Sequence, residues 1–282
     1  MTATEGGTGP EAGGLGWYVY GIVPAADAGA AVSADTPSLD GKHGVELVEE
    51  EPLAAIVTRV PLDEFGDDAL PARLNDLAWL EEKTRAHEEV LECALSTTTV
   101  VPFRFCTIYR REDDLREYLA RGSAALHELI ERLRGRVELG VKSFVDRAAL
   151  ERSLRESLAG APALEEEAGT AGAGRAYLLA RQAERVLGDE VDRFKANCVR
   201  ESHAALTAVA EEARLNRPQS QELSGRREDM LLNGAYLVPS GDDRLRDVVN
   251  ELADRYGKQG VTFEMTGPWP PYNFVPHDLG AP

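Results

Sequence analysis

The chain has 282 residues, and its 49 acidic and 31 basic side chains give a formal net charge of −18. Hydrophobic residues make up 43% of it and charged residues 28%, as in globular proteins, and no run approaches the ~18 apolar residues of a membrane-spanning helix. An acidic surface repels phosphate backbones, and the chain has neither a polybasic cluster nor an apolar leader, which argues against nucleic-acid binding, membrane insertion and a signal peptide.

The first strands are predicted after a polar start. Residues 1–16 consist largely of Gly, Thr, Glu, Ala and Pro with one Leu, so we expect a disordered tail. Residues 17–24, WYVYGIVP, are rich in aromatic and β-branched side chains and end at a proline, which predicts a strand. Two further strands are predicted at 43–49 and 53–60, joined by a tight hairpin.

Apolar residues at helical spacing predict one helix over about 72–95 and another over 111–135. Between them, residues 97–105 (TTTVVPFRF) predict a strand. Pro102 indicates that this strand lies at an edge or contains a bulge, because proline donates no ladder hydrogen bond. Residues 17–134 therefore predict an N-terminal α+β domain of order β-β-β-α-β-α, with helices on one face of a mixed, mostly antiparallel sheet.

The second half of the chain alternates in a similar way. Its predicted elements are a strand, a short helix, a flexible acidic link, a long helix, a strand, a helix and a strand, at 136–145, 146–158, 160–174, 175–214, 229–239, 242–256 and 261–267. One helix of about 40 residues would span about 60 Å, so a break into two helices is an alternative. Residues 135–266 predict a modified ferredoxin-like domain with a long helix and one strand fewer.

The last segment, residues 267–282, differs from both predicted domains. Its prolines exclude a regular helix or a central strand, whereas Trp269, Tyr272 and Phe274 make it too apolar for a free tail. We expect it to pack across a domain or to offer a surface to a partner.

Common catalytic and phosphate-binding motifs are absent from the sequence. No P-loop, no G-x-G-x-x-G and no G-x-S-x-G occurs, and GTAGAGRA at 169–176 is more typical of a linker than of a phosphate loop. His87 and His127 each lack the second histidine of a zinc-binding helix, since Leu91 and Glu131 stand four residues later. We therefore expect no metal, no cofactor and no enzymatic activity.

An alternative is a Cys/His enzyme. His87, Cys93, Arg104 and Cys106 would converge if the helix over 72–95 packs on the following strand. A structural hydrogen bond from the histidine and small buried thiols is the commoner arrangement. Arg104 and Lys142 are more often paired structural charges than ligands. A third hypothesis, by analogy of fold alone, is a small-molecule-sensing ferredoxin-like module. Three cysteines, with Cys198 the last, are too few for a disulfide framework and favour a reducing cytoplasm.

Seven segments occur in one order along the chain. They are WYVYGIVP, RAHEEVLE, VVPFRF, VELGVKSF, GRAYLLARQ, NGAYLVP and GPWPPYNFV. This ordered set resembles the gas vesicle protein GvpF/GvpL family over residues 17–275. Two positions depart from the family pattern: Cys106 stands where glycine is usual and Leu139 where tryptophan is usual. The cysteine argues against a positive-φ turn at that point, which glycine would permit.

The resemblance implies a non-enzymatic, chaperone-like accessory protein, a minor structural component that associates with the small hydrophobic shell protein and with other gas vesicle accessory proteins. It implies support of vesicle nucleation or growth, at the gas vesicle in the cytoplasm. It also implies two α+β domains, the second a modified ferredoxin-like unit. A soluble, acidic partner would keep the apolar face of a shell subunit from aggregating in water.

Two binding modes follow for such a partner. A strand of the shell protein could add to an exposed sheet edge, or apolar aromatic side chains could lie against its hydrophobic face. The candidate partner-binding residues are Trp269, Tyr272 and Phe274 in the last segment, and Pro102, Phe103 and Arg104 on the predicted edge strand.

Overall fold

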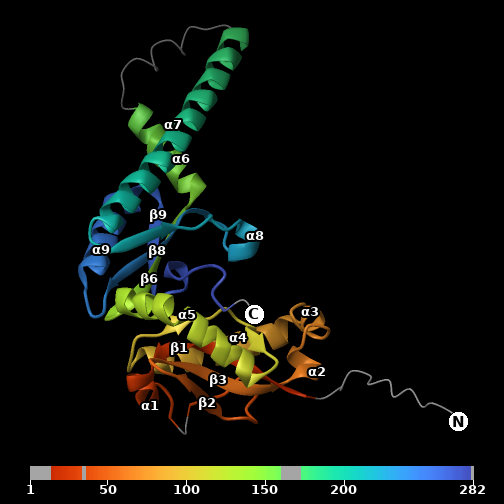
Figure 1. Ribbon diagram of the computed structural model, residues 1–282. Helices are drawn as coiled ribbons and strands as arrows, with labels where there is room; N and C mark the ends of the chain where they lie inside the picture. The colour runs from red at the N-terminus through yellow and green to blue at the C-terminus, as the bar shows by residue number, and fades with distance from the viewer. Residues whose placement is uncertain (1–13, 34–35, 160–172, 281–282) are drawn as a thin grey trace, which may run out of the picture. The chain divides into compact units, whose positions relative to one another are not determined.

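The computed structural model describes residues 14–33, 36–159 and 173–280. The chain divides into two compact units (Figure 1): unit 1 is Met1–Val137 with Trp269–Pro282, and unit 2 is Glu138–Pro268. Most of the expected tail at 1–16 and of the expected link at 160–174, with its phosphate-loop alternative, lies outside the described residues. No helix in the described part of the chain is long and apolar enough to cross a bilayer.

Within the described residues, unit 1 folds around a five-stranded sheet. Its strands are β1 Leu15–Pro24, β2 Val45–Glu50, β3 Leu53–Pro61, β4 Val101–Pro102 and β5 Ile108–Tyr109. Its helices and short helical turns are η1 Ala25–Asp27, α1 Ala28–Ala31, α2 Leu62–Phe65, α3 Leu70–Arg73, α4 Leu77–Leu95, α5 Glu112–Leu133 and η3 Tyr272–Phe274. The strands pair in the order β2-β3-β1-β4, and β5 also pairs with β1. These pairings are antiparallel.

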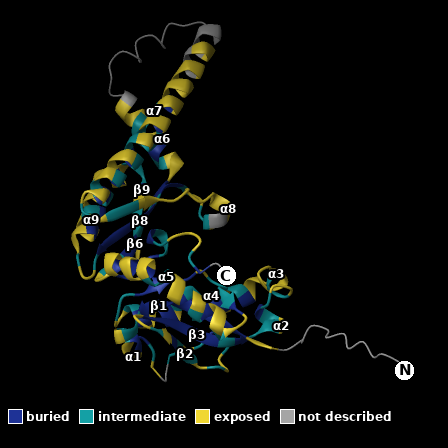
Figure 2. Ribbon diagram, in the orientation of Figure 1, coloured by how far each residue is buried: buried dark blue, intermediate teal, exposed yellow. Residues whose placement is uncertain are grey.

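The two long helices lie on opposite faces of this sheet, so the expectation of helices on one face is wrong. Tyr18 of β1 contacts His87 of α4. The residue before it in β1, Trp17, points to the other face and pairs with Tyr109, whose ring packs against Tyr118 of α5. The reason lies in β1 itself, because its residues 16–23 are all buried (Figure 2). A strand apolar on both sides needs a covering layer on each.

Helix α4 begins five residues later than predicted. The side chain of Asp76 accepts hydrogen bonds from the backbone N–H groups of Ala78 and Trp79, which caps the helix at this point. Leu74 and Leu77, two of the apolar residues whose helical spacing predicted this helix, are 41% and 78% exposed. Helix α5 matches the predicted helix closely, and it buries one apolar face, made of Leu115, Leu119, Leu126, Leu129, Ile130 and Leu133.

The predicted strand over 97–105 is reduced to the two residues of β4. It lies last in the order β2-β3-β1-β4, which confirms that Pro102 marks an edge. The chain then leaves the sheet through a turn in which Cys106 has φ +65°, the only non-glycine positive φ among the described residues. The cysteine argued against a positive-φ turn at this point, and the structure has one all the same. After the turn, β5 pairs with the other end of β1.

Unit 2 is a second mixed layer of strands and helices. Its strands are β6 Arg136–Val145, β7 Glu212–Leu215, β8 Asp229–Pro239 and β9 Val261–Trp269, in the sheet order β7-β8-β6-β9. Its helices are α6 Arg147–Ala159, α7 Ala173–Thr207, α8 Gln221–Ser224, α9 Arg244–Tyr256 and the short η2 Gly257–Gln259.

The long helix α7 corrects the sequence analysis twice. It is a single unbroken helix, and it ends at Thr207 instead of 214. Residues 212–215 form β7, which pairs with β8 from Glu212 opposite Leu237 to Leu215 opposite Gly234. These four residues, EARL, are good helix formers in isolation, so only pairing with β8 turns them into a strand. The described part of unit 2 therefore has one strand more than predicted.

Candidate functional site

The last part of the chain lies on unit 1. We call residues 269–280 the C-terminal segment. Its aromatic Tyr272 packs against the core between the sheet and α4. Phe274, two residues later, is 2% exposed, and its carbonyl oxygen accepts a hydrogen bond from Arg132 of α5. The aromatic residues that made this segment too apolar for a free tail are thus largely consumed in packing.

A chain of hydrogen bonds fixes the segment to the core of unit 1. The backbone N–H of Cys106 donates to the hydroxyl of Tyr18 (3.2 Å), which lies 2.7 Å from Nδ1 of His87. Nε2 of His87 lies 2.9 Å from the hydroxyl of Tyr272, which donates to Oε1 of Glu88 (3.1 Å). Every donor finds an acceptor if His87 is neutral with its proton on Nε2.

Burial decides which groups along this series of hydrogen bonds carry a proton. It lowers the pKa of His87 from 6.5 to about 4, so the imidazole is neutral at physiological pH. Burial also raises the pKa of the Glu88 carboxyl, and it raises the pKa of the Cys106 thiol to about 12. Both ring nitrogens of His87 are engaged by tyrosine hydroxyls, so neither is available to activate a cysteine. Cys93 is exposed and Cys106 holds its proton firmly, which leaves the Cys/His enzyme without support.

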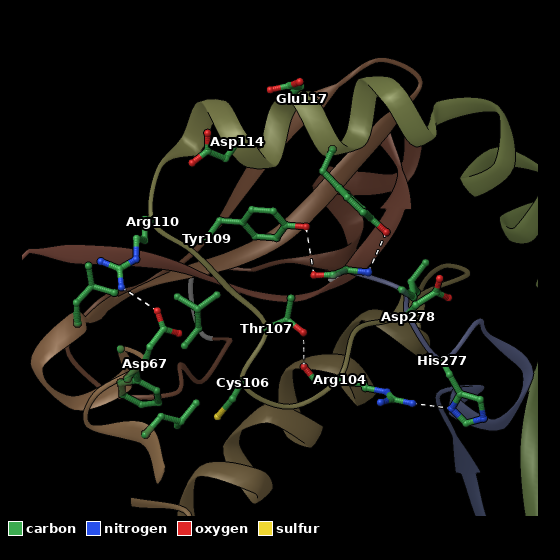
Figure 3. Close-up of a pocket in the computed structure, with 18 of the residues that line it drawn as sticks. Asp67, Arg104, Cys106, Thr107, Tyr109, Arg110, Asp114, Glu117, His277 and Asp278 are labelled. Atoms are coloured by element: carbon green, nitrogen blue, oxygen red, sulfur yellow. Dashed lines mark hydrogen bonds and ion pairs between the residues drawn. The ribbon is translucent and has the colours of Figure 1, made fainter. Parts of the chain in front are cut away.

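The other end of the C-terminal segment reaches the α5 face. The backbone N–H of Gly280 donates to the hydroxyl of Tyr118 (2.9 Å), and its carbonyl accepts from the hydroxyl of Tyr109 (3.3 Å), which is labelled in Figure 3. Gly280 has φ +76°, and a Cβ there would lie 2.5 Å from the ring of Phe103. The segment therefore passes around the β4 edge from one face of the sheet to the other.

The two groups of predicted partner-binding residues meet at this edge. Pro102, Phe103 and Phe274 are buried, so their side chains are not accessible to a partner while the segment stays in place. Arg104 is exposed, and its guanidinium lies 2.6 Å from Nδ1 of His277, a ring nitrogen and not a carboxylate. Trp269 keeps 36% of its surface exposed.

Sequence reasoning missed the groove in Figure 3, which has a volume of about 620 Å³. Its walls come from α2, α3, β5, α5 and the end of the C-terminal segment. At its mouth Arg110 pairs with Asp67 (2.8 Å). The strand β5, at the floor, is too short to give a sequence signal, and Tyr118 and Gly280 come together only through the fold. Among the described residues, no cluster of His, Cys, Asp or Glu has the geometry of a metal site.

Comparison with known proteins gives consistent matches over the length of the chain. The family model of the gas vesicle synthesis proteins GvpL/GvpF matches residues 16–276. Gas vesicle protein L of Streptomyces sp. (strain CB03234) is 36% identical over 84% of this chain and 86% of its own length. Gas vesicle protein L1 of Halobacterium salinarum is 24% identical over 94% and 92%.

Two crystal structures have a similar fold. That of the gas vesicle protein GvpF from Anabaena sp. PCC7120 has a TM-score of 0.64 at 19% identity and covers 93% of this chain and 98% of its own. That of GvpF from Microcystis aeruginosa has a TM-score of 0.61 at 20% identity, with 92% and 98% covered. The mixed α/β architecture with antiparallel pairing is therefore shared with solved gas vesicle proteins.

Proposed function

The chain belongs to the GvpL/GvpF family of gas vesicle synthesis proteins, and from this membership we propose that it binds the small hydrophobic shell subunit and supports the nucleation or growth of vesicles. Membership of the family implies a part in gas vesicle formation and confirms the resemblance found in the sequence. The proposal adds the partners, which are the shell subunit and other gas vesicle accessory proteins. It also adds the location, at the vesicle in the cytoplasm.

The exposure of side chains at the β4 edge indicates which residues contact the shell subunit. At the edge of the unit 1 sheet, Phe103 and Phe274 are buried and hold the C-terminal segment in place. Trp269 at the head of the segment is 36% exposed, Tyr272 is half-buried and Arg104 is exposed. We assign contact with the shell subunit to these three side chains, and to Pro102, Phe103 and Phe274 the support of that surface. Aromatic and arginine side chains in such settings commonly dominate protein–protein affinity.

The experiment is co-expression with the shell subunit from the same genome. We expect the chain to raise the soluble fraction of the subunit and to co-purify with it at low and moderate salt. Trp269→Ala should reduce the recovered subunit by about tenfold, the loss typical of an interface hot spot. Leu77→Ala is the matched control, because Leu77 is a 78% exposed apolar side chain on another element of unit 1. Absence of co-purification, or equal loss in both variants with folding intact, contradicts the proposal.

We also infer that unit 2 is a variant of the ferredoxin-like fold. Its element order is β6, then α6 and α7, then β7 and β8, then α9 and β9, and its sheet order is β7-β8-β6-β9. That fold consists of two strand–helix–strand units, and the first strand of each unit lies in the centre of the sheet next to the other. Here these two central strands are β6 and β8. The extra long helix α7 is the modification.

A further inference from the structure

The strand β5 has an open edge. Val19 of β1 donates its N–H to the carbonyl of Thr107 (2.9 Å), and Tyr109 lies opposite Trp17 in the same ladder. In an antiparallel ladder alternate residues turn their backbone groups toward the neighbouring strand. Ile108, between Thr107 and Tyr109, therefore turns its N–H and C=O away from β1. Neither group forms a hydrogen bond to any other residue that the structure describes.

This open edge contrasts with the edge next to it. At β4 the C-terminal segment covers the strand, and Pro102 lies in one small cavity with Tyr272, Val275 and Leu279. At β5 the segment has moved to the α5 face, where Gly280 is held by Tyr118. Nothing in the described part of the chain takes the place of a neighbouring strand at β5.

The open edge forms the floor of the 620 Å³ groove described above. The residues that line the groove include Leu62 of α2, Leu70 of α3, Tyr118 of α5 and Leu279 of the C-terminal segment. Leu62, Leu70, Ile108 and Leu279 are all half-buried, so each keeps apolar surface that a further side chain could cover. The volume lies within the range of sites that enclose a ligand of moderate size.

We propose that this groove receives an extended, largely apolar segment of a partner polypeptide, which adds to β5 as a further strand. The backbone of the segment pairs with the N–H and C=O of Ile108, and one of its apolar side chains lies against Leu62 and Leu70. The inference rests on the proposed function for the identity of the partner, the shell subunit, and on the groove itself for the mode of binding.

Three observations select this occupant. The unmet groups of Ile108 are one donor and one acceptor at the spacing of a peptide backbone, which a strand satisfies. Helices α2, α3 and α5 and the end of the C-terminal segment line the groove together with β5, which suits a single extended chain better than the edge of a second folded sheet. The third observation concerns the start of the described chain: the carbonyl of Gly14 accepts from the N–H of Leu62 (2.9 Å), a residue that lines the groove. The sequence before Gly14 has only Met1 and Pro10 as apolar side chains larger than alanine, so it does not match a largely apolar occupant.

The test uses the full chain and overlapping short peptides that tile the shell subunit. Binding is measured by fluorescence anisotropy, and backbone amide exchange at Ile108 is measured with and without the tightest peptide. We expect the peptide to slow exchange of the Ile108 amide by about tenfold or more, as for an amide that enters a ladder. Methylation of the one peptide backbone nitrogen that donates to the Ile108 carbonyl should abolish binding, whereas methylation of the nitrogen on either side of it, which points away from β5, should leave binding intact.

A pair of variants tests the apolar wall. Leu70→Asp places a charge in the groove and should weaken peptide binding by about tenfold or more, since burying an unpaired carboxylate is costly. Leu74→Asp makes the same change at a 41% exposed leucine that lies outside the groove, and it should leave the affinity within about twofold. Circular dichroism confirms that both variants are folded.

Several results would overturn the inference. Binding without slowed exchange at Ile108, or equal sensitivity to methylation at every position, rules out strand addition. Slower exchange at Ile108 with rising protein concentration alone identifies a second copy as the occupant. Faster exchange on deleting residues 1–13 identifies the chain's own start. If the shell subunit co-purifies while no peptide slows exchange at Ile108, this inference fails and the proposed function stands; loss of co-purification as well removes both.

Discussion

The hydroxyl of Tyr272 lies 2.9 Å from Nε2 of His87, although 185 positions separate the two residues in the chain. The contact joins the C-terminal segment to α4 inside the core of unit 1. The neutral imidazole has one N–H, and this contact puts it on Nε2, where it donates to the Tyr272 hydroxyl.

Removing that hydroxyl should weaken unit 1. In Tyr272→Phe the Nε2–H of His87 loses its hydroxyl partner and Oε1 of Glu88 loses its donor. A buried polar group left unpaired costs about 1–3 kcal/mol, and we expect the free energy of unfolding to fall by that amount in urea titrations. Tyr177→Phe is the control, because the Tyr177 side chain is 60% exposed. Equal stability of the two variants would contradict the hydrogen-bond chain.

The buried imidazole predicts a pH dependence. Native His87 takes up a proton only near pH 4, whereas the unfolded chain does so near 6.5. Between these values the unfolded state binds more protons, so His87 stabilises the fold fully above pH 6.5 and loses this contribution, about 3 kcal/mol, as the pH falls to 4. Glu88 acts in the opposite direction, since its raised pKa favours the fold at low pH and the benefit is lost as the pH rises through that pKa.

The contribution of His87 can be separated from that of the carboxylates by comparing variants. The slope of unfolding free energy against pH between 6.5 and 4 should be smaller in His87→Gln than in the parent chain. His127→Gln, at an exposed histidine of α5, should keep the parent slope. A parent slope that persists in His87→Gln would show that another group titrates in this window.

The turn at Cys106 predicts a contrast between two substitutions. At φ +65° an L-residue is strained by about 1–2 kcal/mol, and glycine relieves the strain but costs about 0.5–1 kcal/mol in chain entropy. Cys106→Gly should therefore change the free energy of unfolding by less than about 1 kcal/mol. Cys106→Val should lower it by more than about 2 kcal/mol, because a β-branched side chain fits this conformation poorly.

Cys93→Val, on the exposed side of α4, is the control for the second change and should stay within about 0.5 kcal/mol of the parent. Thermal melts of the three variants check the order. A Cys106→Val variant as stable as the parent would mean that the turn at this position does not hold a positive φ.

Gly280 predicts how firmly the C-terminal segment is held. In Gly280→Ala the new Cβ would lie 2.5 Å from the Phe103 ring, and φ +76° is unfavourable for alanine. We expect the end of the segment to detach, with faster amide exchange at Gly280's neighbours and at Phe274, and about 1–3 kcal/mol lower stability.

Gly188→Ala is the matched control, because Gly188 lies inside α7 and a Cβ there meets nothing within 4 Å. Alanine in a helix is better than glycine by up to about 1 kcal/mol, so this variant should be slightly more stable than the parent. Unchanged exchange at Phe274 in Gly280→Ala would contradict the docking of the segment.

Periodicity predicted the long elements well and the short ones poorly. Helix α5 and strand β1 carry a continuous apolar signal, and their bounds lie within two residues of the prediction. The strands β5 and β7 have two and four residues and owe their conformation to their neighbours β1 and β8, which no local pattern contains. Similarly, the capping by Asp76 overrides the apolar residues that made the helix seem to start at 72.

The candidate site was predicted as two separate surfaces, and in the structure they are one. Phe103 and Phe274 carry the same apolar signal whether they face a core or a partner, so only their burial distinguishes the two roles. The acceptor and donor roles of His87 depend on Tyr18 and Tyr272, which are distant in sequence. At Cys106 the sequence misled in another way. The replacement of glycine by cysteine argued against a positive-φ turn, yet the backbone there has φ +65°.

Unit 1 is built from two pieces of the chain, Met1–Val137 and Trp269–Pro282, and unit 2 lies between them in the sequence. During synthesis on the ribosome the first strands and helices emerge long before Tyr272, Phe274 and Gly280 are made. Until then His87 lacks its acceptor and the β4 edge is bare. The nascent unit 1 therefore waits in an incomplete state while unit 2 is translated, and closes only as the last residues of the segment leave the exit tunnel.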